Sequence, residues 1–293
     1  MTPASLDRAM MIGVSLNLVF VLVEFGFGFF SSSLALLADA GHNASDVVGL
    51  LLAWGASFLA RRQPSQKYTF GLRRATIYAA FLNAILLLAA CAVILWEAVC
   101  RLSDPTPVAG LTMIAVAAIG VVINTATAML FMRGSKQDAN VRGAFLHMAA
   151  DAAVSVGVVL AGVTIMATGI GWIDPVVSII IVIVIAWGTW DLFTESLGLA
   201  MDAVPRHIDI SELTDALVEI PGVLEIHDLH VWGMSTSEVM LTAHLVIVDS
   251  SRQGSLEEAQ ALLRERFGIT HTTLQPDSPS ALQACREQGI DSS

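Results

Sequence analysis

Six long apolar stretches constrain this chain more than any other feature of the sequence. A helix that crosses the hydrocarbon core of a bilayer needs about 20 mostly apolar residues. The stretches that meet this length lie at about 10–30, 34–60, 75–100, 109–132, 143–168 and 173–197. Only 14% of the residues are charged, whereas ordinary soluble domains carry about 25%. The sequence therefore predicts an α-helical integral membrane protein with six spans, and it argues against an ordinary soluble enzyme.

The basic residues fix the expected orientation of these spans. Nine Lys and Arg residues precede the first span or lie in the loops after the second and fourth spans, whereas Arg101 lies on the other side. Loops on the cytoplasmic side of a membrane are enriched in Lys and Arg. We therefore expect a multi-pass protein of a bacterial inner membrane, with both termini in the cytoplasm.

The chain after residue 200 has the pattern of a small soluble domain. Its expected elements are a helix at 208–220, strands at 223–232 and 239–248, a helix at 256–267 and a strand at 269–275. This αββαβ order suits an open sheet with both helices on one face. The expected domains are a transmembrane domain at 1–200, a cytoplasmic α+β domain at 201–276 and a disordered tail at 277–293.

The charge of the chain limits the kinds of partner that it is expected to bind. The net charge is −11, and proteins that bind nucleic acid usually present a basic surface instead. We therefore expect no nucleic-acid partner. The cytoplasmic domain is small enough for its core to be marginal, so pairing with a second copy would stabilise it.

Two His-x-x-x-Asp pairs are the strongest chemical signal in the membrane spans. The second span contains His42 and Asp46, and the fifth contains His147 and Asp151. Residues four apart lie on one helix face, and an Asp near the centre of a span costs about 2.5–3.5 kcal/mol. Two imidazoles and two carboxylates form a tetrahedral set that suits Zn²⁺. The alternative is that each pair is a hydrogen bond that holds helices together.

Other ionisable residues in the spans have simpler interpretations. Glu97 lies four residues before Arg101, which predicts an ion pair at the membrane interface. Asp174 precedes a proline and is expected to cap the sixth helix. Glu24 lies deeper, and its role stays open.

The two halves of the membrane domain have a weak likeness that indicates inverted repeats. Such a repeat places a binding site near the midplane, at the interface of the halves. Asp151 lies closer to its basic loop than Asp46 does. Either tilt or a fifth helix that begins before residue 143 would bring the two carboxylates to one depth.

Several motifs along the chain resemble one family. They are Ser33-Leu-Ala-Leu-Leu-Ala-Asp-Ala-Gly-His42, Tyr68-Thr-Phe-Gly-Leu-Arg-Arg74, Arg142-Gly-Ala-Phe-Leu-His147-Met-Ala-Ala-Asp151, Asp202-Ala-Val-Pro205, His227-Asp-Leu-His230-Val-Trp232, Thr242-Ala-His244 and His271-Thr-Thr-Leu-Gln275. Together they are similar to the cation diffusion facilitator family, in its zinc-exporting branch.

The resemblance implies both an architecture and an activity. It implies six spans, a metallochaperone-like cytoplasmic domain and a homodimer. It also implies export of cytoplasmic Zn²⁺, with Cd²⁺ or Co²⁺ as further substrates, in exchange for protons. In that family the transport site falls on the paired motif of the second and fifth spans, which is His42, Asp46, His147 and Asp151 in this sequence.

The cytoplasmic domain contains a second candidate metal site. His227 and His244 lie on two neighbouring expected strands, and Asp277 follows the third strand, where relatives carry a carboxylate. These three residues would bind Zn²⁺ in a sensing site, but a clear fourth ligand is missing, and ordinary surface or core roles stay open. His230 is three residues from His227, which places it on the opposite strand face.

Three classes of function fit a metal-binding membrane protein. A secondary transporter accounts for both buried pairs. An intramembrane metalloprotease would use a His-Glu-x-x-His helix, and the sequence contains none, so we expect no enzyme. A membrane-tethered metal sensor without transport activity is the alternative, and it would explain the cytoplasmic domain but not the two pairs in the membrane.

Overall fold

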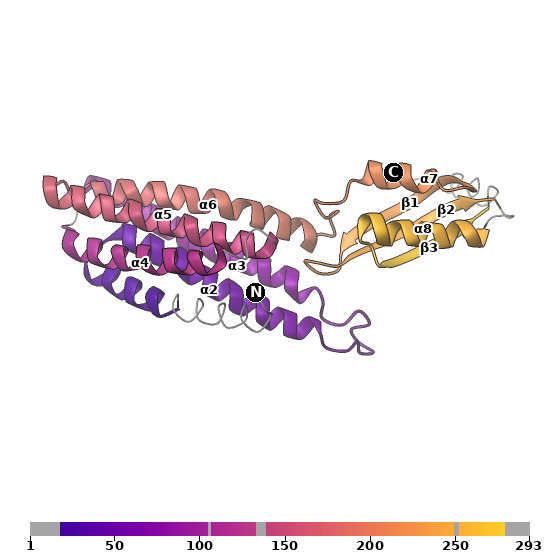
Figure 1. The fold of residues 1–293 in the computed structure, drawn as a ribbon, viewed down its shortest axis with the longest axis horizontal. Coiled ribbons are helices and arrows are strands. Elements are labelled where there is room, and N and C mark those ends of the chain that lie inside the picture. Colours follow the sequence, from indigo (N-terminus) through magenta and orange to yellow (C-terminus); the bar gives the residue numbers. More distant parts are fainter. Residues whose placement is uncertain (1–17, 105–106, 133–138, 249–251, 279–293) are drawn as a thin grey trace. The chain divides into compact units, whose positions relative to one another are not determined.

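The structure is a computed structural model that describes residues 18–104, 107–132, 139–248 and 252–278. The chain divides into two compact units. The first combines residues up to Leu52 with Leu82–Asp191, and the second combines Ala53–Phe81 with the chain from Leu192 onward. Figure 1 shows the long helices and the three-stranded sheet that follows them.

Long helices form at the positions that the sequence predicts. They are a helix at Leu18–Phe30, α2 (Leu34–Ala60), α3 (Ala75–Ser103), α4 (Gly110–Met132), α5 (Ala139–Thr168) and α6 (Ile173–Ala200). The expected part of the first span before residue 18 lies outside the described residues. Segments of α3, α4, α5 and α6 are long and apolar enough to cross a membrane. The chain is therefore an integral membrane protein, while the count of six spans stays a prediction.

The start of α5 agrees with one of the two explanations for the depth of Asp151. The helix begins at Ala139, four residues before the expected start of the fifth span. An earlier start lengthens the helix on the side of its basic loop, by about 6 Å at 1.5 Å per residue. The helix therefore extends farther from Asp151 on this side than the expected bounds implied.

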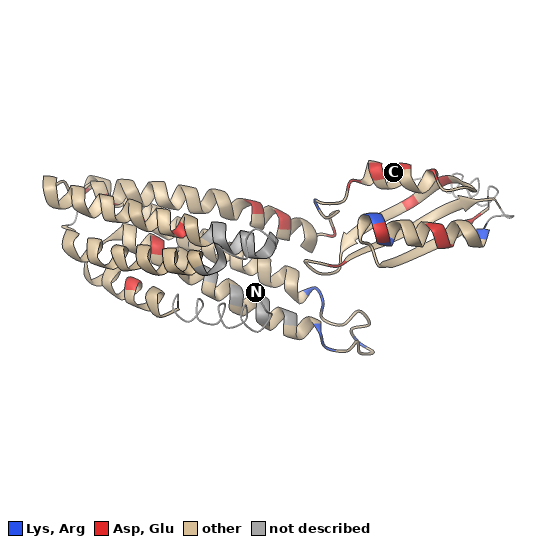
Figure 2. Ribbon diagram, in the orientation of Figure 1, with Lys and Arg blue, Asp and Glu red and all other residues tan. Residues whose placement is uncertain are grey.

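The first unit packs its helices around a shared apolar core. Buried residues of α2 to α6 meet in one cluster, which includes Leu36, Met113 and Val158. Gly120 on α4 allows a close approach, because a Cβ at this position would lie 2.6 Å from the Phe20 ring and 3.1 Å from Ser155 Oγ. Figure 2 shows acidic residues within these otherwise apolar helices. The bundle thus surrounds carboxyl groups with apolar packing.

Asp174 caps a different helix from the one that the sequence predicts. Its carboxylate accepts hydrogen bonds from Ser33 Oγ at 2.7 Å, from the Leu34 backbone N–H at 2.9 Å and from that of Ala35 at 3.3 Å. These groups belong to the start of α2, whereas α6 already begins at Ile173. The prediction that Asp174 caps the sixth helix was therefore wrong. The start of α2 has N–H groups without helical partners, and the buried carboxylate satisfies them.

The C-terminal part folds in the expected αββαβ order. Its elements are α7 (Ile210–Val218), β1 (Val223–Gly233), β2 (Val239–Ile247), α8 (Arg252–Phe267) and β3 (His271–Asp277). The sheet has the order β1-β2-β3; β1 and β2 are antiparallel, and β2 and β3 are parallel. The third strand extends to Asp277, which the sequence placed at the start of the tail.

One face of this sheet carries the domain core. Alternate residues of β2 from Val239 to Ile247 are buried in a single cluster with Leu217 of α7 and Leu263 of α8. Side chains of a strand alternate between its faces, so both helices cover the same face. His244 lies between the buried positions and therefore belongs to the opposite face.

Candidate metal centres

The structure brings together one member of each pair in the membrane spans. His42 of α2 and Asp151 of α5 approach within 3.3 Å, measured from Nε2 to Oδ1. The Asp151 side chain is 1% exposed and that of His42 is 18% exposed. A buried carboxylate of α5 therefore lies beside an imidazole of α2.

The other two predicted ligands lie on the same two helices. Asp46 is one turn after His42 within α2, and His147 is one turn before Asp151 within α5. Their side chains lie outside the described residues, so the complete four-ligand set stays a prediction. Their spacing keeps each of them on the helix face of its partner.

The predicted pair at the end of α3 is confirmed. Arg101 Nε donates to Glu97 Oε1 at 2.9 Å, four residues apart. The guanidinium also donates to the Ser32 carbonyl oxygen. This basic side chain therefore ties the end of α3 to the turn before α2 and is not a candidate for metal chemistry.

The sheet assembles the cytoplasmic candidate site. His227 of β1 lies directly across from His244 of β2 in the strand register. Asp277 Oδ2 is 2.9 Å from His244 Nδ1 and 3.2 Å from His227 Nε2. One ligand atom from each residue lies within 4.8 Å of the others. Two imidazole nitrogens and a carboxylate oxygen form three of the four corners of a zinc site.

The electrostatics of this cluster favour the form of Asp277 that binds metal. Burial raises the pKa of the Asp277 carboxyl, but hydrogen bonds from Gln275 and His244 and the charges of His244 and His227 outweigh it, so the pKa lies below its ordinary value. A carboxyl must lose its proton to act as a ligand. The protein thus holds this group in the ionised state.

A β-bulge moves His230 to a face that sequence spacing did not predict. The strand register shifts between His227 and His230, and His230 pairs with Thr242, two residues from His244. His230 therefore lies on the same face as His227, and the prediction of the opposite face was wrong. The bulge contains Asp228, and the φ of this residue, 51°, lies in the left-handed region.

The same bulge adds a functional candidate that sequence reasoning missed. Asp228 Oδ2 lies 3.7 Å from His244 Nε2, while Oδ1 lies 3.0 Å from His230 Nε2. His244 thus presents Nδ1 to Asp277 and Nε2 to Asp228. Carboxylates often orient a metal-binding imidazole through its second nitrogen. The only signal in the sequence is that an Asp follows directly after His227.

Comparison with known protein families shows to which family this chain belongs. The family model described as the cation efflux transmembrane domain matches residues 10–199, and that of the cation efflux protein cytoplasmic domain matches residues 205–279. The chain belongs to the cation efflux family. This is a family of transporters, and a metal-cation efflux function follows from membership.

Individual relatives of this cation efflux protein cover most of its length. Zinc transporter ZitB from Escherichia coli is 38% identical over 87% of this chain and 82% of its own. Metal cation efflux system protein CzcD from Cupriavidus metallidurans is 33% identical over 99% and 93%. A cadmium, cobalt and zinc/H(+)-K(+) antiporter from Bacillus subtilis is 36% identical over 88% and 85%.

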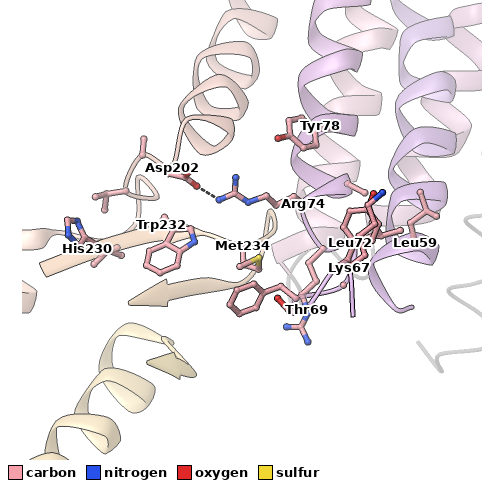
Figure 3. A pocket seen from close by; sticks show the side chains of 18 of the residues that line it. Leu59, Lys67, Thr69, Leu72, Arg74, Tyr78, Asp202, His230, Trp232 and Met234 are labelled. Carbon is pink, nitrogen blue, oxygen red and sulfur yellow. Dashed lines mark hydrogen bonds and ion pairs between the residues drawn. The ribbon is translucent and has the colours of Figure 1, made fainter. Parts of the chain in front are cut away.

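The second unit of this cation efflux protein also contains a large open cleft of about 1080 Å³ (Figure 3). Residues of the segment between α2 and α3 line it together with residues near β1, and Arg74 forms an ion pair with Asp202 at its edge. Among the described residues that line it, His230 and Asp202 are the only His, Cys, Asp or Glu side chains. The cleft therefore lacks the ligands of a metal centre.

Proposed function

We propose that this protein exports cytoplasmic Zn²⁺ in exchange for protons. The metal binds in the membrane at a site composed of His42, Asp46, His147 and Asp151. The observation that carries the proposal is the approach of His42 to the buried Asp151, at 3.3 Å between two helices of the bundle. The relatives named as a zinc transporter and as a zinc/H(+)-K(+) antiporter support the substrate and the exchange.

The proposed ligands explain why metal and protons compete. Zn²⁺ binds neutral imidazole nitrogen and ionised carboxylate oxygen, so protons must leave before the metal binds. The reference pKa of histidine is about 6.5. Acidification from neutral pH therefore weakens binding of the metal at this site.

The proposed direction of transport depends on topology. The Lys and Arg residues of the loops after α2 and α4 support a cytoplasmic location for these loops and for the C-terminal domain. In this orientation α2 runs inward and α5 runs outward. We place the protein in a bacterial inner membrane, which agrees with the bacterial origin of the relatives.

The proposed assembly is a homodimer with a regulatory zinc site in each cytoplasmic domain. The family name of the matched cytoplasmic domain contains the word dimer, and a small core gains stability from a second copy. His227, His244 and Asp277 would hold the ion, and Asp228 would orient His244. The ion would link the three strands of the sheet.

The sensor hypothesis has less support. The relatives are named as transporters, an efflux system and an antiporter. A sensor would also need no buried His–Asp contact in the membrane bundle. Transport therefore accounts for both parts of the chain.

Metal selectivity tests the proposed ligands. The substitution His42→Asp changes the donor set from two nitrogens and two oxygens to one nitrogen and three oxygens. Oxygen-rich sets suit harder ions with higher coordination numbers, so we expect continued transport with a broader preference towards Cd²⁺ or Mn²⁺. The measurement is competitive flux of Zn²⁺, Cd²⁺ and Mn²⁺ into vesicles. An unchanged ratio among the three ions would show that His42 does not bind the metal.

A further inference from the structure

A pair of carboxyl groups lies in the bundle beside the proposed metal ligands. Glu24 of the helix Leu18–Phe30 and Asp39 of α2 are both fully buried. Glu24 accepts a hydrogen bond from Asn43, which lies one turn after Asp39 on α2, so the two carboxyl groups lie on the same side of this helix. Two buried carboxylates on one side of a helix repel each other when both are ionised, so the pair is stable only when one of them keeps a proton. The pair therefore holds one exchangeable proton inside the protein.

The neighbours of the pair satisfy one oxygen of each carboxyl group. Asn43 Nδ2 donates to Glu24 Oε2 at 3.1 Å, and Ser155 Oγ donates to Asp39 Oδ2 at 3.0 Å. Within the described part of the chain, Glu24 Oε1 and Asp39 Oδ1 receive no hydrogen bond from another donor. These two oxygens are therefore available to carry the proton.

Three of the helices around the pair carry no fixed cation that could take the place of that proton. The helix Leu18–Phe30, α2 and α4 contain no Lys or Arg. The titratable groups that act on the pair are His42 of α2 and Asp151 of α5, besides the two carboxyls themselves. A buried charge without a partner is expensive, so a proton or another cation must balance the second carboxylate.

The pair lies next to the proposed metal site. Asp39 precedes His42 by three residues on α2, and Ser155 follows Asp151 by four residues on α5. At 1.5 Å per residue, these offsets correspond to about 4.5–6 Å along the helix axes. On both helices the offset points away from the basic loops. In the proposed orientation the pair therefore lies on the outer side of the metal site, where protons arrive.

A further buried polar side chain marks this part of the bundle. Asn124 of α4 is 0% exposed, and among the described residues neither its Oδ1 nor its Nδ2 has a hydrogen-bond partner. It lies one turn after Gly120, whose Cβ position is 3.1 Å from Ser155 Oγ. Residues four apart share a helix face. Such an amide in a membrane interior indicates that water or an ion enters this polar region.

We infer that Glu24 and Asp39 form the proton-carrying site of the exchange, separate from the metal ligands. This inference rests on the proposed function. A proton from the outer solution forms an O–H bond with a Glu24 carboxylate oxygen and is shared with Asp39. It leaves that oxygen for cytoplasmic water when the site next faces inward. A dication one helical turn away disfavours the proton, and the proton disfavours the dication, so the two ions alternate.

Glu24→Gln separates proton carriage from metal binding. Glutamine keeps the length and the hydrogen-bonding capacity of the side chain but cannot exchange a proton with water as a carboxyl does. We expect the purified variant, in proteoliposomes, to keep Zn²⁺ binding and Zn²⁺/Zn²⁺ exchange. Its Zn²⁺ flux in an imposed pH gradient should fall to its flux without a gradient. The matched control is Glu195→Gln, which removes an exposed carboxyl of α6 and should keep the stimulation of the wild type.

The outcomes distinguish this inference from the proposed function. If Glu24→Gln keeps the wild-type stimulation by the gradient, the inference is overturned while zinc/proton exchange stands. If the wild type itself shows no flux or no stimulation, the proposed function fails first.

Infrared spectroscopy gives a second readout that does not depend on transport. The wild type should show the C=O band of a protonated carboxyl that disappears when Zn²⁺ binds. That band should be absent from Glu24→Gln. If the Zn²⁺-free wild type has no band that responds to Zn²⁺, the inference is overturned even when this variant does not fold.

Discussion

Removal of the Asp174 carboxylate should destabilise the membrane bundle, because this group caps the buried start of another helix, α2. In Asp174→Ala the backbone N–H groups of Leu34 and Ala35 lose their acceptor, whereas the Ser33 hydroxyl is able to rotate. Each unsatisfied buried donor costs about 1–3 kcal/mol. The two donors together would cost about 2–6 kcal/mol. Because the variant no longer buries a carboxylate, we expect the lower part of that range, about 2–4 kcal/mol.

Unfolding in mixed micelles measures this loss. Purified wild type and Asp174→Ala are titrated with a denaturing detergent, and the free energy of unfolding is followed by tryptophan fluorescence. Asp174→Asn keeps one acceptor oxygen and should lose only about 1–2 kcal/mol. Asp104→Asn removes an exposed carboxyl that follows α3 and is the matched control. An Asp174→Ala variant within about 0.5 kcal/mol of the wild type, the usual range of surface substitutions, would refute the reasoning.

Three further substitutions test other parts of the structure. Gly120→Leu places side-chain atoms where a Cβ is already 2.6 Å from the Phe20 ring; it should lower the free energy of unfolding by about 1–3 kcal/mol, and an unchanged value would contradict the close packing. The Ser211 hydroxyl lowers the pKa of Asp209, so this cap stabilises α7 above about pH 3.9 and stops doing so as the pH falls through the lower pKa of the folded state. Asp209→Asn should remove that pH dependence from thermal unfolding, and an identical profile would count against the cap. Asp277→Asn should abolish one class of Zn²⁺ binding in calorimetry of the full-length protein while vesicle transport persists; retention of both classes would exclude Asp277 as a ligand.

The positions of the long helices could be predicted from the sequence because they depend on local composition. The stretch at 34–60 coincides with α2, since a membrane helix satisfies all its backbone groups within itself. The pairing of His227 with His244 was likewise accessible from strand alternation. The αββαβ order was also predictable, because it follows directly from the succession of helix and strand patterns along the chain.

Other features depend on neighbours that the sequence does not reveal. Asp174 lies about 140 residues from the N–H groups that it accepts from, so local spacing assigned it to the wrong helix. His230 changed face because the left-handed residue Asp228 adds a bulge. Glu24 had no assigned role, because the side chain that donates to it, that of Asn43, lies on another helix.

Zinc flux through Asp151→Ala vesicles tests the central claim most directly. Wild-type protein in proteoliposomes should transport Zn²⁺ when the opposite side is acidic, and the variant should lose this flux while it remains a folded dimer by size-exclusion chromatography. The account predicts the loss because Asp151 is the buried carboxylate that meets His42 between α2 and α5. Wild-type Zn²⁺ flux in the folded variant would contradict the assignment of the transport site.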